Sequence, residues 1–237
     1  MKRPTAGITP NWIANEPPTD RVYGQWMYAL NQKYSDLAES TGFVPLLLLP
    51  GSSPDAAGQA LRSVDLLVLT GGGDPDPVLC SSCVPESRCL VETRYGWDIS
   101  LFREAVSLGI PVLGICLGIQ LIAVSEGEEL IVDILTEDES RLDHHGSGRN
   151  PKEHDVEMVP GTLLHALLGD VRSVSTYHHQ AVRGVPAGYA VSARAADGIL
   201  EGMESADGRI LAVQWHPERD GTGPAIMAHF RRLCAGE

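Results

Sequence analysis

One cysteine of this sequence has the surroundings that covalent catalysis requires. Cys116 lies between Gly114 and Gly118, where the apolar residues 110–115 meet residues 116–124 of helical character. A nucleophile on a sharp strand-to-helix turn needs glycine two positions away on each side, because larger side chains would collide. The helix N-terminus favours a thiolate, and the N–H of Leu117 would face a developing oxyanion. The alternative is a structural cysteine packed between glycines.

A histidine and a glutamate close a second apolar run near the end of the chain. His216 and Glu218 stand on either side of Pro217, after residues 210–215. In extended backbone, residues i and i+2 project to the same side, so the carboxylate can orient the imidazole while the other ring nitrogen faces a thiol. Taken alone, this spacing is more typical of a solvated pair. Its occurrence together with the Cys116 turn indicates a catalytic base and its orienting group.

The first half of the chain predicts the elements that would position these groups. Apolar runs at residues 6–9, 43–49, 65–69 and 110–115 predict strands, the second of them buried. Helical spacing is found at residues 26–40, 54–62, 94–108 and 116–124. Alternating strands and helices of these lengths predict an α/β fold, with a mostly parallel central sheet and helices on both faces, in three layers.

The second half has a different pattern, which predicts additional antiparallel strands. Residues 126–152 are rich in acidic residues, histidine and glycine and are expected to be mostly surface loop. Strands are predicted at residues 155–159, 173–177, 189–194, 199–204 and 210–215, with Asp-Gly turns between some of them. A last helix is expected at 224–233. Without a long linker or repeat, residues 1–237 are predicted to form a single domain.

The composition excludes several classes of partner. The chain has 31 acidic and 18 basic residues, a formal net charge of −13, which argues against nucleic-acid binding. No apolar run approaches the length of a membrane span, and the first residues lack the apolar core of a signal peptide. Five cysteines match a disulfide scaffold poorly. We therefore expect a cytoplasmic protein with a small-molecule substrate, for which a homodimer is possible.

With these motifs in hand, the sequence resembles the class I glutamine amidotransferase superfamily, and in particular its γ-glutamyl-γ-aminobutyrate hydrolase-like branch. The resemblance extends over nearly the whole chain. It is carried by the segments GITPNW at 7–12, GFVP at 42–45, LTGGGDPDP at 69–77, GIPVLGIC at 109–116, HHQA at 178–181, LEGME at 200–204 and VQWHPE at 213–218.

The resemblance implies a set of site residues. It implies a catalytic triad of Cys116, His216 and Glu218. It also implies an oxyanion hole from the backbone N–H of Leu117 and of a glycine in the 71–73 run, with Gly72 favoured and Gly73 the other candidate. Substrate contacts are implied for three further residues: Gln120, His179 and Gln180. No metal or organic cofactor is implied.

Three departures from the branch concern the rim of the site. Leu117 stands where the branch commonly has arginine after the nucleophile, as in many glutaminase subunits. The sequence EGEE at 126–129 replaces a small Gly-Gly-Thr turn, and Arg94-Tyr95 replaces the usual Arg-Asp pair. These departures leave the identity of the substrate open.

Two other clusters of ligand-type residues could be metal sites. Cys80, Cys83 and Cys89 lack a fourth ligand in the same segment, which favours loop cysteines without a catalytic role over zinc or a disulfide. His144 and His145, with His154 nearby, are surrounded by polar and glycine residues and are interpreted as part of a solvated loop. The sequence therefore predicts no metal ligands.

The predicted activity is hydrolysis of γ-glutamyl amide bonds through a thioester on Cys116, with polyamine or amine catabolism as a context. Two alternatives remain open. One is a glutaminase subunit that delivers ammonia to a synthase partner, which Leu117 keeps open. The other is a catalytically silent binding protein on the same fold, which the presence of His216 and Glu218 disfavours.

Overall fold

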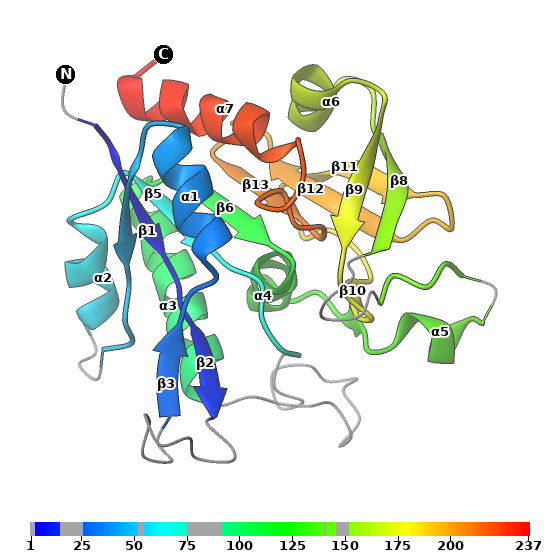
Figure 1. The fold of residues 1–237 in the computed structure, drawn as a ribbon, viewed down its shortest axis with the longest axis horizontal. Helices are drawn as coiled ribbons and strands as arrows, with labels where there is room; N and C mark the ends of the chain where they lie inside the picture. The colour runs from blue at the N-terminus through cyan, green and yellow to red at the C-terminus, as the bar shows by residue number, and fades with distance from the viewer. Residues whose placement is uncertain (1–2, 15–25, 52–54, 75–91, 140, 146–151) are drawn as a thin grey trace.

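A nine-stranded sheet organises the protein (Figure 1). The computed structural model describes residues 3–14, 26–51, 55–74, 92–139, 141–145 and 152–237. The strand order is β4-β1-β5-β6-β13-β12-β11-β8-β9. The three cysteines that were expected in a loop, Cys80, Cys83 and Cys89, lie outside the described residues.

The first five strands in this order run parallel and the other four are antiparallel. The parallel part contains β4 (Val44–Leu47), β1 (Thr5–Ile8), β5 (Leu66–Leu69), β6 (Val112–Ile115) and β13 (Ile210–Val213). The antiparallel part contains β12 (Leu200–Ser205), β11 (Tyr189–Ala195), β8 (Lys152–Met158) and β9 (Val171–Thr176). Two small sheets pair β10 (Ala181–Val182) with β7 (Leu130–Ile131) and β2 (Asn11–Ala14) with β3 (Trp26–Ala29).

Helices cover both faces of the sheet, which confirms the predicted α/β fold. One apolar core packs α1 (Gln32–Ser40), α6 (Leu163–Leu168) and α7 (Gly223–Ala235) against the sheet. The other core packs α2 (Ala56–Leu61), α3 (Glu92–Leu108) and α4 (Leu117–Ser125). In Figure 1, α1 lies in front of the sheet and α3 behind it. Strand β5 shows the reason, because Leu66 and Val68 belong to one core while Leu67 and Leu69 belong to the other.

Two sequence predictions in the first half need correction. Residues 26–40 were expected to be one helix, but Trp26–Ala29 form β3 and the helix begins only after Asn31. The Asn31 side chain accepts a hydrogen bond from the N–H of Lys33, which caps α1 at that point. The strand at 44–47 was expected to be buried, yet Leu46 and Leu47 are exposed because β4 is an edge strand.

The second half follows the predicted strands with some additional elements. The expected loop at 126–152 contains β7 and the short helix α5 (Ile134–Glu137). Helix α6 was not predicted, although Thr162 caps it by accepting a hydrogen bond from the N–H of His165. The Asp-Gly turns join β11 to β12 and β12 to β13, with Gly198 and Gly208 at positive φ.

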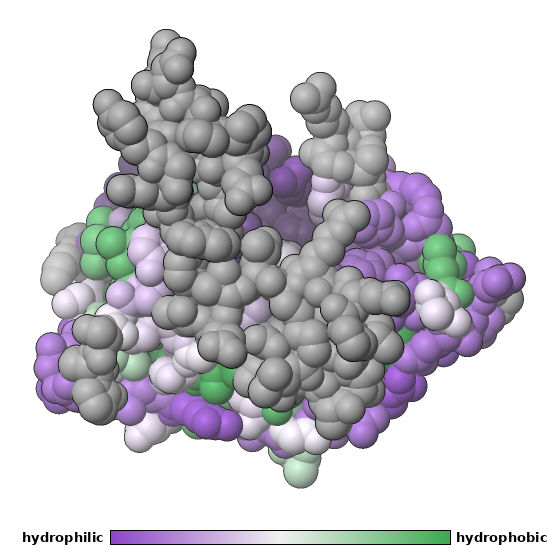
Figure 2. All heavy atoms as spheres, turned by 90° about the horizontal axis from the view of Figure 1, so that it is seen from below, coloured by the Kyte–Doolittle hydropathy of each residue, from purple (hydrophilic) through white to green (hydrophobic). Residues whose placement is uncertain are grey.

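One face of the molecule is mostly hydrophilic (Figure 2). Figure 2 shows the face that lies at the bottom of Figure 1, where hydrophilic residues predominate among the coloured atoms and apolar atoms form small separate groups. Within the described ranges, no helix combines the length and apolar character that crossing a membrane requires.

Candidate active site

Cys116 occupies a strained turn between β6 and α4. It has φ 52° and ψ −101°, and it is the one residue other than glycine with positive φ among the described residues. Such a conformation costs about 1–3 kcal/mol and persists only where the surrounding structure imposes it. Here the sheet imposes it, because the N–H of Cys116 donates to the carbonyl of Val213 on β13 at 2.8 Å.

The two glycines around Cys116 are required by close packing. A Cβ at Gly114 would lie 2.8 Å from Ile122 Cδ1 and 3.1 Å from the Cβ of Ala212. A Cβ at Gly118 would lie 2.5 Å from the carbonyl oxygen of Leu69. Both positions therefore exclude a side chain, as the sequence motif predicted, and the sharp entry into α4 depends on them.

The structure brings His216 beside the side chain of Cys116 and Glu218 beside His216. Nδ1 of His216 lies 2.7 Å from Oε1 of Glu218, and the Glu218 side chain is almost fully buried. Burial alone would lower the pKa of His216, but the charge of Cys116 and its hydrogen bond, together with Glu218, raise it to about 10. An imidazolium held beside the sulfur favours a thiolate, which is the nucleophilic form of cysteine.

A pair of buried glutamines, one of which the sequence analysis did not select, adjoins the sulfur. Gln214 directs Nε2 toward Cys116 Sγ at 3.7 Å. Nε2 of Gln120 lies 3.4 Å from the Gln214 amide oxygen and donates to the carbonyl of Gln180 at 3.2 Å. Gln120 was expected to contact substrate, and the structure places it on α4 at the pocket lining, with its side chain bonded to the loop that contains Gln180. Gln214 lies two residues before His216 on the same chain segment, which was the available signal.

The glycine-rich segment after β5 passes directly in front of the nucleophile. A Cβ at Gly71 would lie 2.8 Å from His216 Cε1 and 3.4 Å from the Cβ of Cys116. The N–H of Gly71 donates to the Tyr34 hydroxyl at 3.0 Å, so it is already engaged. Gly72, the next residue along the segment, lines the pocket and stays the predicted oxyanion donor.

Arg94 fixes the conformation of this segment from the side of α3. Its Nη2 donates to the carbonyls of Thr70 and Gly71, at 3.0 and 3.1 Å, and its Nη1 donates to Asn11 Oδ1 at 2.7 Å. Its Nε lies 3.5 Å from Asp98, whose pKa is raised to about 6 because burial outweighs the attraction of the guanidinium. Arg94 was noted in the sequence only as a departure, whereas it holds the backbone beside the nucleophile.

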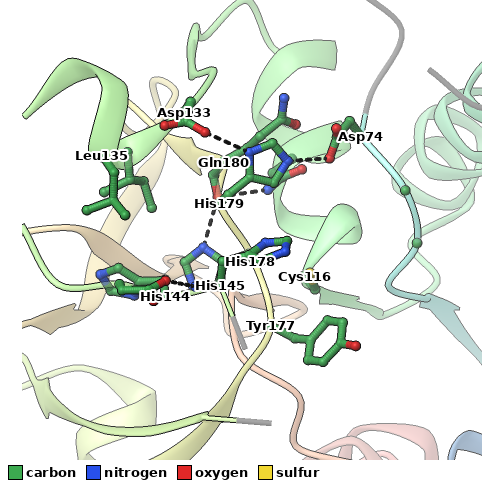
Figure 3. A pocket seen from close by; sticks show the side chains of 15 residues that line it. Asp74, Cys116, Asp133, Leu135, His144, His145, Tyr177, His178, His179 and Gln180 are labelled. Atoms are coloured by element: carbon green, nitrogen blue, oxygen red, sulfur yellow. Dashed lines mark hydrogen bonds and ion pairs between the residues drawn. The ribbon is translucent and has the colours of Figure 1, made fainter. Parts of the chain in front are cut away.

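A pocket of about 510 Å³ opens on the sulfur (Figure 3). Its lining includes the predicted residues Gly72, Gly73, Cys116, Gln120, His179 and Gln180. It also includes residues that the sequence did not select, among them Asp74, Asp133 and Tyr177. The Leu117 side chain is buried against Tyr95 and Ile99 rather than in the pocket. Only its backbone N–H, at the first residue of α4, remains a candidate donor.

His179 bridges two carboxylates across the pocket. Its Nε2 lies 2.9 Å from Asp74 and its Nδ1 3.2 Å from Asp133, and Figure 3 shows the ring between them. The hydrogen bond to Asp74 raises the pKa of His179, and Asp133 adds to that effect against the opposing influence of burial. The ring therefore connects the end of the glycine-rich segment to the start of α5.

The comparison with protein families decides the membership of the chain. The model of the Peptidase C26 family matches residues 4–218, which include all the groups described above. The chain belongs to the Peptidase C26 family. The fold and the relatives below place this family member among the class I glutamine amidotransferase-like hydrolases.

Curated relatives extend over most of this family member. Protein NtpR of Enterococcus hirae is 33% identical over 222 residues, which cover 91% of each chain. A Mycobacterium tuberculosis protein named "Putative glutamine amidotransferase Rv2859c" is 39% identical over 184 residues, covering 75% of this chain and 58% of that protein. A Thermotoga maritima glutamine amidotransferase of known structure has a TM-score of 0.57 at 16% identity, over 99% of this chain and 95% of that one.

Proposed function

We propose that the protein hydrolyses γ-glutamyl amide bonds, with Cys116 as nucleophile, His216 as acid and base, and Glu218 as the group that orients His216. The proposal rests on the contacts among three residues. Cys116 lies in a strained turn, the pKa of the neighbouring His216 is raised to about 10, and Nδ1 of His216 lies 2.7 Å from Oε1 of Glu218. Membership of the Peptidase C26 family supports hydrolysis at a cysteine. Amides of γ-glutamyl groups, such as γ-glutamyl-γ-aminobutyrate, are the substrate class that this proposal adds.

In the first step, the thiolate of Cys116 attacks the γ-carbonyl carbon of the substrate. The carbonyl electrons move onto the oxygen, which backbone N–H groups of Leu117 and Gly72 stabilise. When the tetrahedral intermediate collapses, the C–N bond breaks and the amine leaves with a proton from His216. A γ-glutamyl thioester on Cys116 remains.

In the second step, the same imidazole acts as a base. Thioester formation removes the negative charge of the sulfur, which is the main group that raises the pKa of His216. The neutral ring that results takes a proton from water, which attacks the thioester and releases glutamate and the thiolate. The charge of Cys116 thereby couples the protonation state of His216 to the stage of the reaction.

A panel of γ-glutamyl amides tests the proposal. Purified protein is incubated with glutamine, γ-glutamyl-γ-aminobutyrate and related γ-glutamyl amines, and glutamate release is measured. We expect turnover of at least one amide and its loss in Cys116→Ala. Cys234→Ala is the matched control, because burial and Asp65 raise the pKa of Cys234 to about 11 and it lies outside the pocket. Retention of activity in Cys116→Ala contradicts the proposal.

A second candidate function is supply of ammonia to a synthase partner. A glutamine-hydrolysing GMP synthase subunit of Haloquadratum walsbyi is 30% identical over 180 residues, which cover 74% of this chain and 79% of that protein. Under this alternative, glutamine turnover would rise strongly when the partner is added. Equal turnover by the isolated chain and by the chain supplemented with cell extract favours the stand-alone hydrolase. If no amide is turned over and Cys116 fails to react with a glutamine analogue that carries an electrophilic γ carbon, the outcome favours a silent binding protein.

A further inference from the structure

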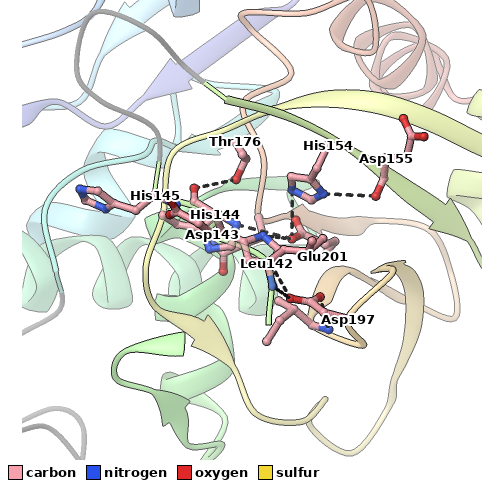
Figure 4. Close-up of polar contacts among 12 residues, drawn as sticks. Leu142, Asp143, His144, His145, His154, Asp155, Thr176, Asp197 and Glu201 are labelled. Carbon is pink, nitrogen blue, oxygen red and sulfur yellow. Dashed lines mark hydrogen bonds and ion pairs between the residues drawn. The ribbon is translucent and has the colours of Figure 1, made fainter. Parts of the chain in front are cut away.

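Three imidazoles and one carboxylate converge behind the pocket wall. They are His144, which follows α5, His154 on β8, His178, which follows β9, and Glu201 on β12. One nitrogen or oxygen from each lies within 4.8 Å of those of the other three. We call these four residues the histidine cluster; Figure 4 shows His144 and His154 directed at Glu201. None of the four has a role in the proposed reaction.

The facing atoms of the histidine cluster are buried and lack hydrogen-bond partners. Among the described residues, no hydrogen bond of acceptable geometry reaches Nδ1 of His144, Nε2 of His154, Nε2 of His178 or either carboxylate oxygen of Glu201, although Nδ1 of His144 approaches Oε1 of Glu201 to 3.2 Å. Glu201 is fully buried, and His144 and His178 are 2% and 4% exposed. Buried polar atoms are nearly always satisfied, so this many together indicate a missing group at their centre.

The hydrogen-bond partners of the outward-facing ring nitrogens indicate which nitrogen of each ring carries the hydrogen. Nδ1 of His178 lies 2.9 Å from the carbonyl of Gln180, and Nδ1 of His154 lies 3.2 Å from the carbonyl of Asp155. A carbonyl oxygen only accepts, so each Nδ1 carries the hydrogen. In the neutral ring, Nε2 of both histidines then presents a lone pair to the centre of the cluster.

His144 is arranged in the same way with the opposite nitrogen. Its Nε2 lies 2.9 Å from Asp197 Oδ2, so that nitrogen carries a hydrogen, and in the neutral ring Nδ1 presents a lone pair. With all three rings neutral, three lone pairs face the carboxylate of Glu201, an arrangement that is repulsive unless a proton or a metal ion lies between them. Histidines that bind metals characteristically donate their other N–H to a carboxylate or a backbone carbonyl, as all three do here.

The spacing of the atoms suits a tetrahedral ion. Oε1 of Glu201 lies 3.2 Å from Nδ1 of His144 and 3.5 Å from Nε2 of both His154 and His178. Four ligands at about 2.0–2.1 Å from a tetrahedral zinc ion would be about 3.3 Å from one another. The three distances from Glu201 match this value, and the remaining ones, up to 4.8 Å, require the rings to move inward.

We propose that the histidine cluster binds one divalent transition-metal ion of the zinc type. Imidazole ligands select such ions over magnesium and calcium, which prefer oxygen ligands. Four protein ligands complete a tetrahedral shell and leave no position for water or substrate, so the site is structural. The burial of His144 corrects the expectation of a solvated loop at that residue. The proposed metal site goes beyond the proposed function because no step of the hydrolysis uses the ion.

The ion would fasten one wall of the pocket. His144 and His178 both line the pocket, and His178 directly precedes His179, which bridges Asp74 and Asp133. The backbone already joins these segments, since the N–H of His178 donates to the carbonyl of His144 at 3.1 Å. Binding of an ion would lock this wall to β8 and β12 of the main sheet.

Metal content of the purified protein tests this proposal without any reference to activity. Tag-free protein is expressed in zinc-supplemented medium, dialysed against a weak chelator and analysed by mass spectrometry for metals. We expect about one zinc per chain in the native protein and a loss of at least about tenfold in His154→Ala. His154 is the most exposed ligand, so its replacement disturbs the core least. His165→Ala is the control, because His165 lies on α6 and pairs with Asp170.

A second measurement uses the unmodified sequence and so does not depend on the folding of a variant. The protein is stripped with a strong chelator, and Zn²⁺ alone is added back while the melting temperature is followed. We expect a rise that saturates at one equivalent, in Cys116→Ala as in the native protein, which separates this proposal from the proposed function. Two results would overturn the site: native protein that contains no metal and whose melting temperature does not change with Zn²⁺, or an equal loss of zinc in His165→Ala. In either case the buried histidines would be interpreted as stabilised by protonation alone.

Discussion

The guanidinium of Arg94 occupies the space that a side chain at Gly72 would need. A Cβ built at Gly72 would overlap Nη1 of Arg94 and lie 2.8 Å from its Cζ. Arg94 cannot withdraw without cost, because it donates to the carbonyls of Thr70 and Gly71 and is paired with the buried Asp98. The glycine and the arginine therefore form a matched pair that sets the path of the backbone in front of Cys116.

Gly72→Ala should destabilise the protein and reduce its activity. Displacing Arg94 strains a closely packed site, for which we expect a loss of about 1–3 kcal/mol in the free energy of unfolding. Chemical denaturation measures this loss. Gly96→Ala is the control, because a Cβ there has no atom within 4 Å and alanine within helix α3 should stabilise by about 0.5–1 kcal/mol. Equal effects of the two substitutions would contradict the matched pair.

Glu218→Gln should lower the rate of the chemical step with little effect on substrate binding. Glutamine keeps the size of the side chain but removes its negative charge. That charge orients the His216 ring, whose Nδ1 lies 2.7 Å from Oε1 of Glu218, and stabilises the protonated form of the ring. By analogy with other triads, we expect kcat for glutamate release to fall by about 10²- to 10⁴-fold. Glu126→Gln, on the surface, should be neutral. A change in KM alone would place Glu218 in substrate binding instead.

Removal of the thiol should lower the pKa of His216. In the native protein the charge of Cys116 and Glu218 together raise it to about 10, so His216 stays protonated at neutral pH and loses its proton only in alkali. In Cys116→Ala the sulfur is absent while burial still disfavours the charged ring, so the imidazole should titrate at markedly lower pH. NMR of histidine-labelled protein follows this titration. An unchanged His216 titration would show that its charge does not depend on Cys116.

His179→Gln should cost more stability in acid than in alkali. Because Asp74 and Asp133 raise the pKa of His179, the bridge is fully present below the ordinary value of about 6.5. Its contribution is lost as the pH rises through the higher value of the folded protein. For this partly exposed bridge we expect a difference of about 0.5–1 kcal/mol at pH 6 that shrinks by pH 9. Urea denaturation at both pH values measures it, and an equal loss at pH 6 and pH 9 would contradict the charged bridge.

Local patterns in the sequence predicted the elements that carry the proposed triad. The apolar run at 110–115, the flanking glycines and the spacing of His216 and Glu218 indicated the strand, the turn and the shared face that the structure contains. These features depend on neighbouring residues alone. The helix predicted at 26–29 was wrong because the apolar spacing of that strand resembled the following helix, and only the Asn31 cap separates the two.

The remaining parts depend on contacts between distant segments. The burial of His144 results from Glu201 and Asp197, which come from the β11–β12 region more than fifty residues away in the chain. The polar sequence around residue 144 contained no indication of these partners. For the same reason Tyr34 on α1, which binds the N–H of Gly71, could not be selected from the sequence.

The pairing of β6 with β13 has a consequence for how this protein can diversify. Ile115 lies opposite Val213, so Cys116 and His216 follow two adjacent strands, although the chain between them contains the antiparallel strands β8, β9, β11 and β12. That intervening stretch supplies most of the far wall of the pocket, including Asp133, Tyr177 and His179. Insertions and substitutions there can change the shape of the pocket, while Cys116 and His216 remain anchored by the backbone hydrogen bonds between β6 and β13.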